Sequence, residues 1–282
     1  LECVVATTGS VEPDKPNTFR VHPRHLTYLR RHFDAVGLAN NHSGDFGPQA
    51  FAQMLGLLKR SGVGYYGGGM NLQEAHTPLV FERHGLRIAL LGYDEFQPRN
   101  FEADHDRPGV AWSEDEQVVR DIQDARRVWR ADVVIPVMHW GWEEPKANAR
   151  QRQLARLMID AGADAVIGGH PHLVQDTEQY KGKPIFYSLG NFVFNGFPEG
   201  ERRRGFSGVG EPQHLVQPAG AVRGFDVAQH AAERAAEFDL QHLAHALAIG
   251  HGLDAAQPGE VGDQRAQGAG GRQALRAQEE PA

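Results

Sequence analysis

Apolar residues recur along the first 197 positions with two alternating spacings, one typical of buried strands and the other of helices. The predicted helices cover 23–33, a segment that begins at Pro48 and is stopped by Ser61-Gly62, then 113–129 and 148–161. The predicted strands cover 1–6, 34–39, 63–66, 78–83, 86–93, 133–138 and 165–167, with a hairpin turn at His84-Gly85. Alternation of this kind predicts an α/β fold in which at least some strands are parallel.

Single residues mark where several of these helices begin and end. Pro23 suits the first turn of a helix, because its missing N–H is not needed there. Ser113, with Glu116 three residues later, predicts a capping box at the start of the third helix. Gly162 follows the fourth helix, where a left-handed residue commonly ends a helix.

The character of the chain changes after about residue 198. Residues 205–282 are rich in Gly, Gln, Ala and His, and no convincing strand is predicted there. A helix could form over 228–249, while 257–282 has the low apolar content of a disordered segment. We therefore expect one domain over 1–197 and an irregular tail over 198–282. The tail histidines have no strand-end setting, and we expect them to be solvated: His214, His230, His242, His245 and His251.

Composition narrows the function. The formal net charge is -7, and there is no dense Lys/Arg tract, which argues against nucleic-acid binding. The single cysteine, Cys3, excludes an internal disulfide. No apolar run approaches the roughly 20 residues that span a bilayer.

Histidine and asparagine residues follow several of the predicted strands directly. They lie in GLANNHSGDFG at 37–47, VIPVMHWGWEE at 134–144 and DAVIGGHPHLVQ at 164–175, before IFYSLGNF at 185–192. In open α/β sheets ligands bind at the carboxyl ends of the strands. Nitrogen and oxygen ligands gathered at one such edge predict a metal centre.

The pair His170 and His172 is the clearest of these signals. With one residue between them, extended backbone would send both side chains to the same side of the chain. The alternative is two ordinary loop histidines. His139, at the end of the strand over 133–138, is a candidate third ligand, and its alternative is a core histidine bonded to backbone. Trp140 and Trp142 are expected to pack around the site or line a substrate wall.

The segment Asn40-Asn41-His42 predicts a different division of labour. One amide oxygen would bind a divalent metal, while the imidazole of His42 would lie near the substrate. Asp45 is close enough in sequence to orient His42 and raise its pKa, as a general acid requires. Turn chemistry is the alternative for one asparagine, and an Asx turn is the alternative for Asp45.

Together these segments resemble the CapA family of bacterial poly-γ-glutamate capsule synthesis proteins, whose domain is related to calcineurin-like metallophosphoesterases. The resemblance covers about 1–197 and rests on LANNH at 38–42, HWG at 139–141, GHPH at 169–172 and SLGNF at 188–192. It implies a four-layer α/β/β/α sandwich with a dinuclear metal site at one end. It also implies these roles: Asn41, His139, His170 and His172 as metal ligands, Glu2 as a further ligand, and His42 as the acid.

The sequence departs from the family pattern at both ends of this region. The Gly-Asp segment expected before Leu1 and the strands expected after about residue 200 are not present in it. An incomplete N-terminus and a shifted reading frame near 202–204 would explain both departures.

The resemblance implies a protein of poly-γ-glutamate synthesis, export or anchoring at the bacterial cell surface, held by a membrane segment. Two divalent cations, of Mn, Fe or Zn rather than Ca, would serve a hydrolase site acting on an anionic polymer or a phosphoester. The alternative is a non-catalytic accessory of a membrane polymer-synthesis complex. An intracellular nucleotide phosphoesterase is a third possibility. Because the chain and the polymer are both anionic, binding would rely on the metals and on cations such as Arg150 or Arg152.

Overall fold

In the computed structural model, which describes residues 1–13 and 15–191, the largest element is a six-stranded sheet. Its strands run in the order β11-β12-β10-β9-β7-β6, and the four inner ones are parallel. Edge strands β6 and β11 are antiparallel to their neighbours. The bounds are β6 (Leu79–Arg83), β7 (Leu86–Asp94), β9 (Val133–His139), β10 (Val166–Gly169), β11 (Thr177–Tyr180) and β12 (Lys183–Phe186).

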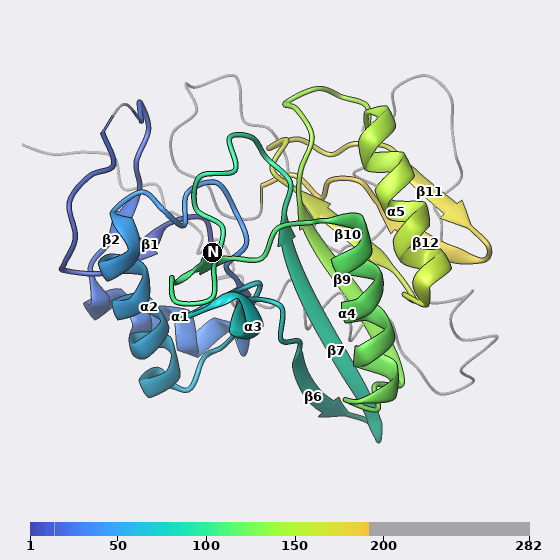
Figure 1. The fold of residues 1–282 in the computed structure, drawn as a ribbon, viewed down its shortest axis with the longest axis horizontal. Coiled ribbons are helices and arrows are strands. Elements are labelled where there is room, and N and C mark those ends of the chain that lie inside the picture. Colours follow the sequence, from blue (N-terminus) through green and yellow to red (C-terminus); the bar gives the residue numbers. More distant parts are fainter. Residues whose placement is uncertain (14, 192–282) are drawn as a thin grey trace, which may run out of the picture. The chain divides into compact units, whose positions relative to one another are not determined.

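Two helices cover one face of this sheet. Figure 1 shows α4 (Asp115–Arg127) and α5 (Ala149–Ala161) lying over β7, β9 and β10. Their buried faces include Ile122 and Leu154, which pack against sheet residues such as Leu91 and Val134. Because each helix connects two parallel strands, the polypeptide crosses this face of the sheet twice.

Short paired strands form a second layer on the other face. The pairs are β1 (Val4–Val5) with β2 (Arg20–Val21), β3 (Ala35–Gly37) with β4 (Gly64–Tyr66), and β5 (Gly68–Gly69) with β8 (Gly109–Val110). A separate core joins this layer to the main sheet, in which Tyr66 packs with Ile88, Leu90 and Ile135.

A third core lies beneath α1 (Leu26–His32) and α2 (Gly47–Ser61). The 3-10 turn Pro23–His25 precedes α1, and the short α3 (Leu72–Ala75) follows α2. Met54 and Leu58 of α2 pack there with Val4 of β1 and Val36 of β3. Three cores separate four layers, so the predicted α/β/β/α sandwich is confirmed, with a second sheet made of short pairs.

Most predicted elements are present, usually with ends shifted by no more than two residues. The strand predicted over 1–6 is reduced to Val4–Val5, and the helix predicted over 23–33 begins as a 3-10 turn. Gly62 and Gly162 end α2 and α5 in left-handed backbone, with φ of 73° and 117°. Strands β2, β5, β8, β11 and β12 and the short helix α3 were not predicted.

The predicted capping box at Ser113 is wrong. Helix α4 begins at Asp115 with Glu114 at its N-cap, and no side chain caps it. Ser113 lies one residue too early and is buried, and its hydroxyl donates to Glu95 instead.

The predicted helix over 228–249, the tail histidines and the boundary after residue 197 lie outside the described residues. Within the described part of the chain, no helix is long and apolar enough to cross a membrane.

Candidate metal centre

The residues with predicted site roles come from four places in the sequence, each next to the end of a strand. Glu2 precedes β1, and Asn41 and His42 occupy the turn after β3. His139 is the last residue of β9, and the His170–His172 pair follows β10. Strands β9 and β10 are parallel neighbours, so their carboxyl ends bring these imidazoles to one edge of the sheet.

The ligand atoms converge on His139. Its Nε2 lies 2.9 Å from Asn41 Oδ1 and 3.1 Å from His170 Nδ1. Glu2 Oε1 lies 3.7 Å from the same nitrogen and 3.8 Å from His172 Nε2. One ligand atom each of Glu2, His170 and His172 also fall within 4.8 Å of one another. The structure therefore brings together all five predicted metal ligands.

These distances fit a shared cation better than they fit hydrogen bonds alone. A ring nitrogen carries either a proton or a lone pair, so His139 Nε2 cannot donate to Asn41 and also accept from His170. Two ligand atoms each about 2.1 Å from one ion lie about 3 Å apart when the angle between them is near 90°. The separations of 2.9 and 3.1 Å match that spacing.

Burial keeps the donor set in the form that metals bind. It lowers the pKa of His139 well below the usual histidine value, with His170 and His172 adding to the effect. Burial, with His172 and His42 nearby, lowers the pKa of His170 to about 4. Both rings are therefore neutral at neutral pH, as metal ligation requires.

Glu2 contributes a carboxylate oxygen that lacks a hydrogen bond. Its Oε1 is buried and has no hydrogen-bond partner among the described residues. Burial raises the pKa of Glu2, although positive charge on His172 or His42 would oppose that shift. A buried oxygen without a donor is costly unless a cation reaches it, so this atom fits the metal as well.

His42 stands beside the ligands and is held by Asp45. Its Nδ1 lies 2.9 Å from Asp45 Oδ2, which also accepts from the Phe19 N–H at 2.6 Å. The Lys15 ammonium donates to the other carboxylate oxygen. Burial opposes ionisation of Asp45, but the hydrogen bonds from His42, Lys15 and Phe19 outweigh it and lower the pKa of the carboxyl. The carboxylate is therefore charged and fixed in place.

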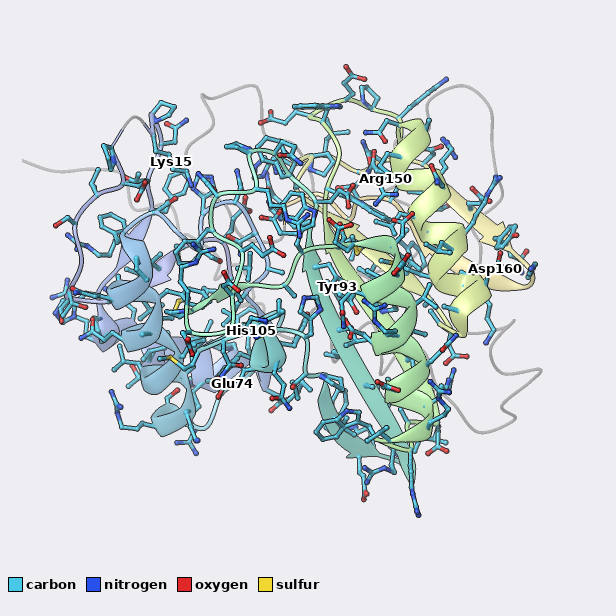
Figure 2. All side chains as sticks on the ribbon, viewed as in Figure 1. Lys15, Glu74, Tyr93, His105, Arg150 and Asp160 are labelled. Atoms are coloured by element: carbon cyan, nitrogen blue, oxygen red, sulfur yellow. The ribbon has the colours of Figure 1, made fainter. Side chains whose placement is uncertain are left out.

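Sequence reasoning missed three residues that support these groups. Asn191 Oδ1 lies 2.8 Å from His172 Nδ1, and its Nδ2 donates to the His172 carbonyl at 3.3 Å. The Phe96 ring lies 4.0 Å from the His170 ring, centre to centre. Lys15 comes from the loop before β2, and Figure 2 labels it. Only Asn191 had a visible signal, because it lies within SLGNF after an apolar run.

The expected backbone of the His170–His172 pair is wrong, although the pair itself converges. Both residues have positive φ, 92° and 59°, so neither is extended. The chain turns sharply after β10, and the turn brings the two rings to a 5.8 Å separation.

The two tryptophans divide between the predicted roles. Trp140 is fully buried, and its indole N–H donates to the Tyr187 carbonyl at 2.8 Å. Trp142 is 58% exposed and meets the Phe96 ring edge to face at 5.7 Å. Trp140 therefore packs beneath the site, while Trp142 presents a face to solvent beside it.

Comparison with known proteins assigns the family. Residues 1–196 match the model described as bacterial capsule synthesis protein PGA_cap. The chain belongs to this family. The PGA biosynthesis protein CapA of Bacillus subtilis is 39% identical over 165 residues, which cover 58% of this chain and 43% of that protein.

A probable polyglutamine synthesis accessory protein of Mycobacterium tuberculosis is 35% identical over 207 residues, covering 68% of this chain and 54% of that protein. The chain thus spans about half the length of these curated relatives. Among solved structures, the NAD nucleotidase of Haemophilus influenzae is 17% identical with a TM-score of 0.37, covering 56% of this chain and 27% of that one. Those values are too low to support a functional comparison.

Proposed function

We propose that this protein acts in the biosynthesis of poly-γ-glutamate or a similar cell-surface polymer through a metal-dependent hydrolase site of the phosphoesterase type. The observation that carries the proposal is that Asn41 Oδ1 and His170 Nδ1 each lie about 3 Å from His139 Nε2, at 2.9 and 3.1 Å. Glu2 and His172, together with His170, would form a second, adjoining ligand set. Imidazole, amide and carboxylate ligands favour Mn, Fe or Zn.

Bound divalent cations would polarise a phosphoryl or acyl oxygen and supply hydroxide at neutral pH. The remaining chemistry belongs to His42. Because Asp45 accepts at Nδ1, the other ring nitrogen of His42 is left to carry the proton for a leaving group. Asp45 accepts from Nδ1–H and so orients the doubly protonated ring that would act as the acid, and Phe19 packs against this ring with ring centres 4.5 Å apart.

The substrate class comes from the family and from the names of relatives. A Bacillus subtilis relative is named for PGA biosynthesis, which supports an anionic polymer or a phosphoester of its synthesis as substrate. A membrane-held polymer-synthesis complex at the cell surface is the setting we propose.

A second candidate function is a non-catalytic accessory subunit with a structural metal site. The name of the Mycobacterium tuberculosis relative, an accessory protein of polyglutamine synthesis, favours it. Under this alternative the ligands matter for folding, and His42 has no chemical task.

Metal analysis and hydrolysis of a generic phosphodiester, both on the protein at its natural length, test the proposal. We expect His170→Ala to lose bound metal and activity together, because it removes a ligand from both sets. His42→Ala should retain the metal and lose about 10²-fold or more in kcat, as loss of a general acid does. His105→Ala is the matched control, since His105 is an exposed histidine in a loop.

The outcomes separate the two candidates. Metal that binds through His170, combined with no hydrolysis and no effect of His42→Ala on polymer production, would favour the accessory role. Absence of metal from the wild-type protein after reconstitution with Mn, Fe and Zn would contradict both.

A further inference from the structure

The outer helical layer formed by α1 and α2 is basic, whereas the chain as a whole is acidic. Residues 15–33 and 46–63 contain no Asp or Glu, although the whole chain has a formal net charge of -7. Asp34 and Asp45 lie between these segments, and of the two only Asp34 is exposed. The exposed cations of these two segments, called here the basic face, are Arg20, Arg24, Arg30, Arg31, Lys59 and Arg60.

Among the residues that the structure describes, none of the six cations of the basic face lies within ion-pair distance of an Asp or Glu. Every arginine on α4 and α5 is paired: Arg120 with Glu116, Arg126 with Asp164, Arg127 with Asp124, Arg150 with Glu95, Arg152 with Asp176 and Arg156 with Glu178. Free positive charge is therefore concentrated on one of the two helical layers.

This distribution changes which cations can receive an anionic polymer. Arg150 and Arg152 were the candidates from sequence, but Arg150 binds Glu95 at 2.7 Å and Asp115 at 2.7 Å. Arg152 is likewise held by Asp176. Figure 2 shows Arg150 beside α5 and Lys15 on the side of the molecule that carries α1 and α2. An incoming anion would have to break existing pairs on α5, whereas the basic face needs no such exchange.

The basic face begins at the candidate metal centre. Phe19 packs on His42, and its N–H bonds to Asp45. The next residue, Arg20, is exposed and lies over the Phe46 ring at 4.2 Å. From there the chain runs through Arg24 into α1, and α1 packs beside α2. A linear polyanion bound along this face would therefore have one end of its path at the site.

We propose that the basic face is a binding surface for a linear polycarboxylate chain, which it guides to the metal centre. The choice of poly-γ-glutamate as that chain rests on the proposed function. The basic face is continuous with the candidate metal centre. This favours a polymer over a membrane as the ligand, because a polymer chain can follow a path that ends beside His42. Neutralising several charges on one polyanion releases counterions, so the affinity falls steeply with salt.

Binding of fluorescently labelled poly-γ-glutamate to the protein at its natural length tests this proposal between about 50 and 200 mM salt. The test variant is Arg24→Glu/Arg30→Glu/Arg31→Glu, which changes exposed side chains outside the catalytic machinery. The control, Arg83→Glu/Arg120→Glu/Arg127→Glu, makes the same change in net charge on other exposed arginines. A glutamine version of the test variant serves if the glutamate version fails to fold.

We expect the test variant to weaken polymer binding about tenfold or more at the lower salt and to flatten the salt dependence, with the control close to wild type. Equal losses in both variants, or none in the test variant, would overturn the proposal. So would tighter wild-type binding to duplex DNA or to phosphatidylglycerol vesicles than to the polymer. Metal content and phosphodiester hydrolysis on the same samples separate the two proposals, since the face can bind polymer even where the site proves inactive.

Discussion

Two histidines of the candidate metal centre hold backbone angles that few residues other than glycine adopt. His170 and His172 have φ of 92° and 59°, and conformations of this kind cost about 1–3 kcal/mol each. Gly168, two residues before His170, is constrained by lack of space instead, because a Cβ there would lie 2.1 Å from the Tyr187 carbonyl oxygen. Strain persists where the surroundings fix it, and here Phe96 packs on one ring while Asn191 holds the other. The turn therefore destabilises the fold locally, and its backbone conformation places the two imidazoles at the candidate metal centre.

Asn191→Ala tests whether that support matters. The amide contacts His172 through both its oxygen and its nitrogen, and groups that orient a ligand commonly contribute 10- to 100-fold, roughly, to metal affinity. We expect Asn191→Ala to weaken metal binding by about that factor in a competition titration with a chelator. Asn100→Ala, at an exposed asparagine, should leave the affinity unchanged. Equal affinities in the two variants would show that the Asn191 contacts do not set the position of His172.

At the scale of elements, α4 and α5 begin in different ways although both connect parallel strands. Helix α5 has a reciprocal cap, in which the Asn148 side chain accepts from the Gln151 N–H and the Gln151 side chain accepts from the Asn148 N–H, each at 2.9 Å. Helix α4 has no such bond. The first turn of α5 is therefore tied locally, while the start of α4 depends on its packing.

Asn148→Ala should destabilise the fold by about 1 kcal/mol, the usual cost of losing an N-cap side chain. Urea unfolding followed by circular dichroism measures it. Gln123→Ala, on the exposed face of α4, is the control and should change the free energy of unfolding by less than about 0.5 kcal/mol. If Asn148→Ala lowered the free energy of unfolding no more than the control does, water would satisfy the Gln151 N–H as well as the Asn148 side chain does.

Elements that carry an apolar run were predictable from sequence, and elements without such a run were not, for a physical reason. Strands such as β9 are continuous apolar runs that only burial on both faces explains. Strand β11, Thr177–Tyr180, alternates exposed and half-buried polar residues, so its place at the sheet edge follows only from its pairing with β12. The two-residue strands β2, β5 and β8 follow only from their pairing with other strands. Most site residues were predictable because they follow apolar strands and carry imidazole or amide groups. The supporting Lys15 comes from a loop with no such signal, and Phe96 follows β7 but has no ligand atom.

For the whole molecule, the metal centre spans two layers. Asn41 and His42 follow β3 of the smaller sheet, while His139 and the His170–His172 pair follow strands of the main sheet. The 2.9 Å separation between Asn41 and His139 therefore depends on how the sheets pack. The core between them is small and includes Tyr66, Ile88, Leu90 and Ile135.

Ile135→Ala and Leu154→Ala, two fully buried positions, separate this effect from simple stability. Each should cost about 2–5 kcal/mol in urea unfolding, because each leaves a cavity in a packed core. Ile135 lies between the sheets, so its loss should also weaken metal binding well below the unfolding transition, as Asn41 shifts relative to His139. Leu154 lies on the buried face of α5, in the core between that helix and the main sheet. Its loss should leave the metal affinity of the folded protein unchanged. If both variants bound metal as tightly as wild type, the sheets would hold their spacing without Ile135, and the ligand geometry would be fixed within each layer's own loops.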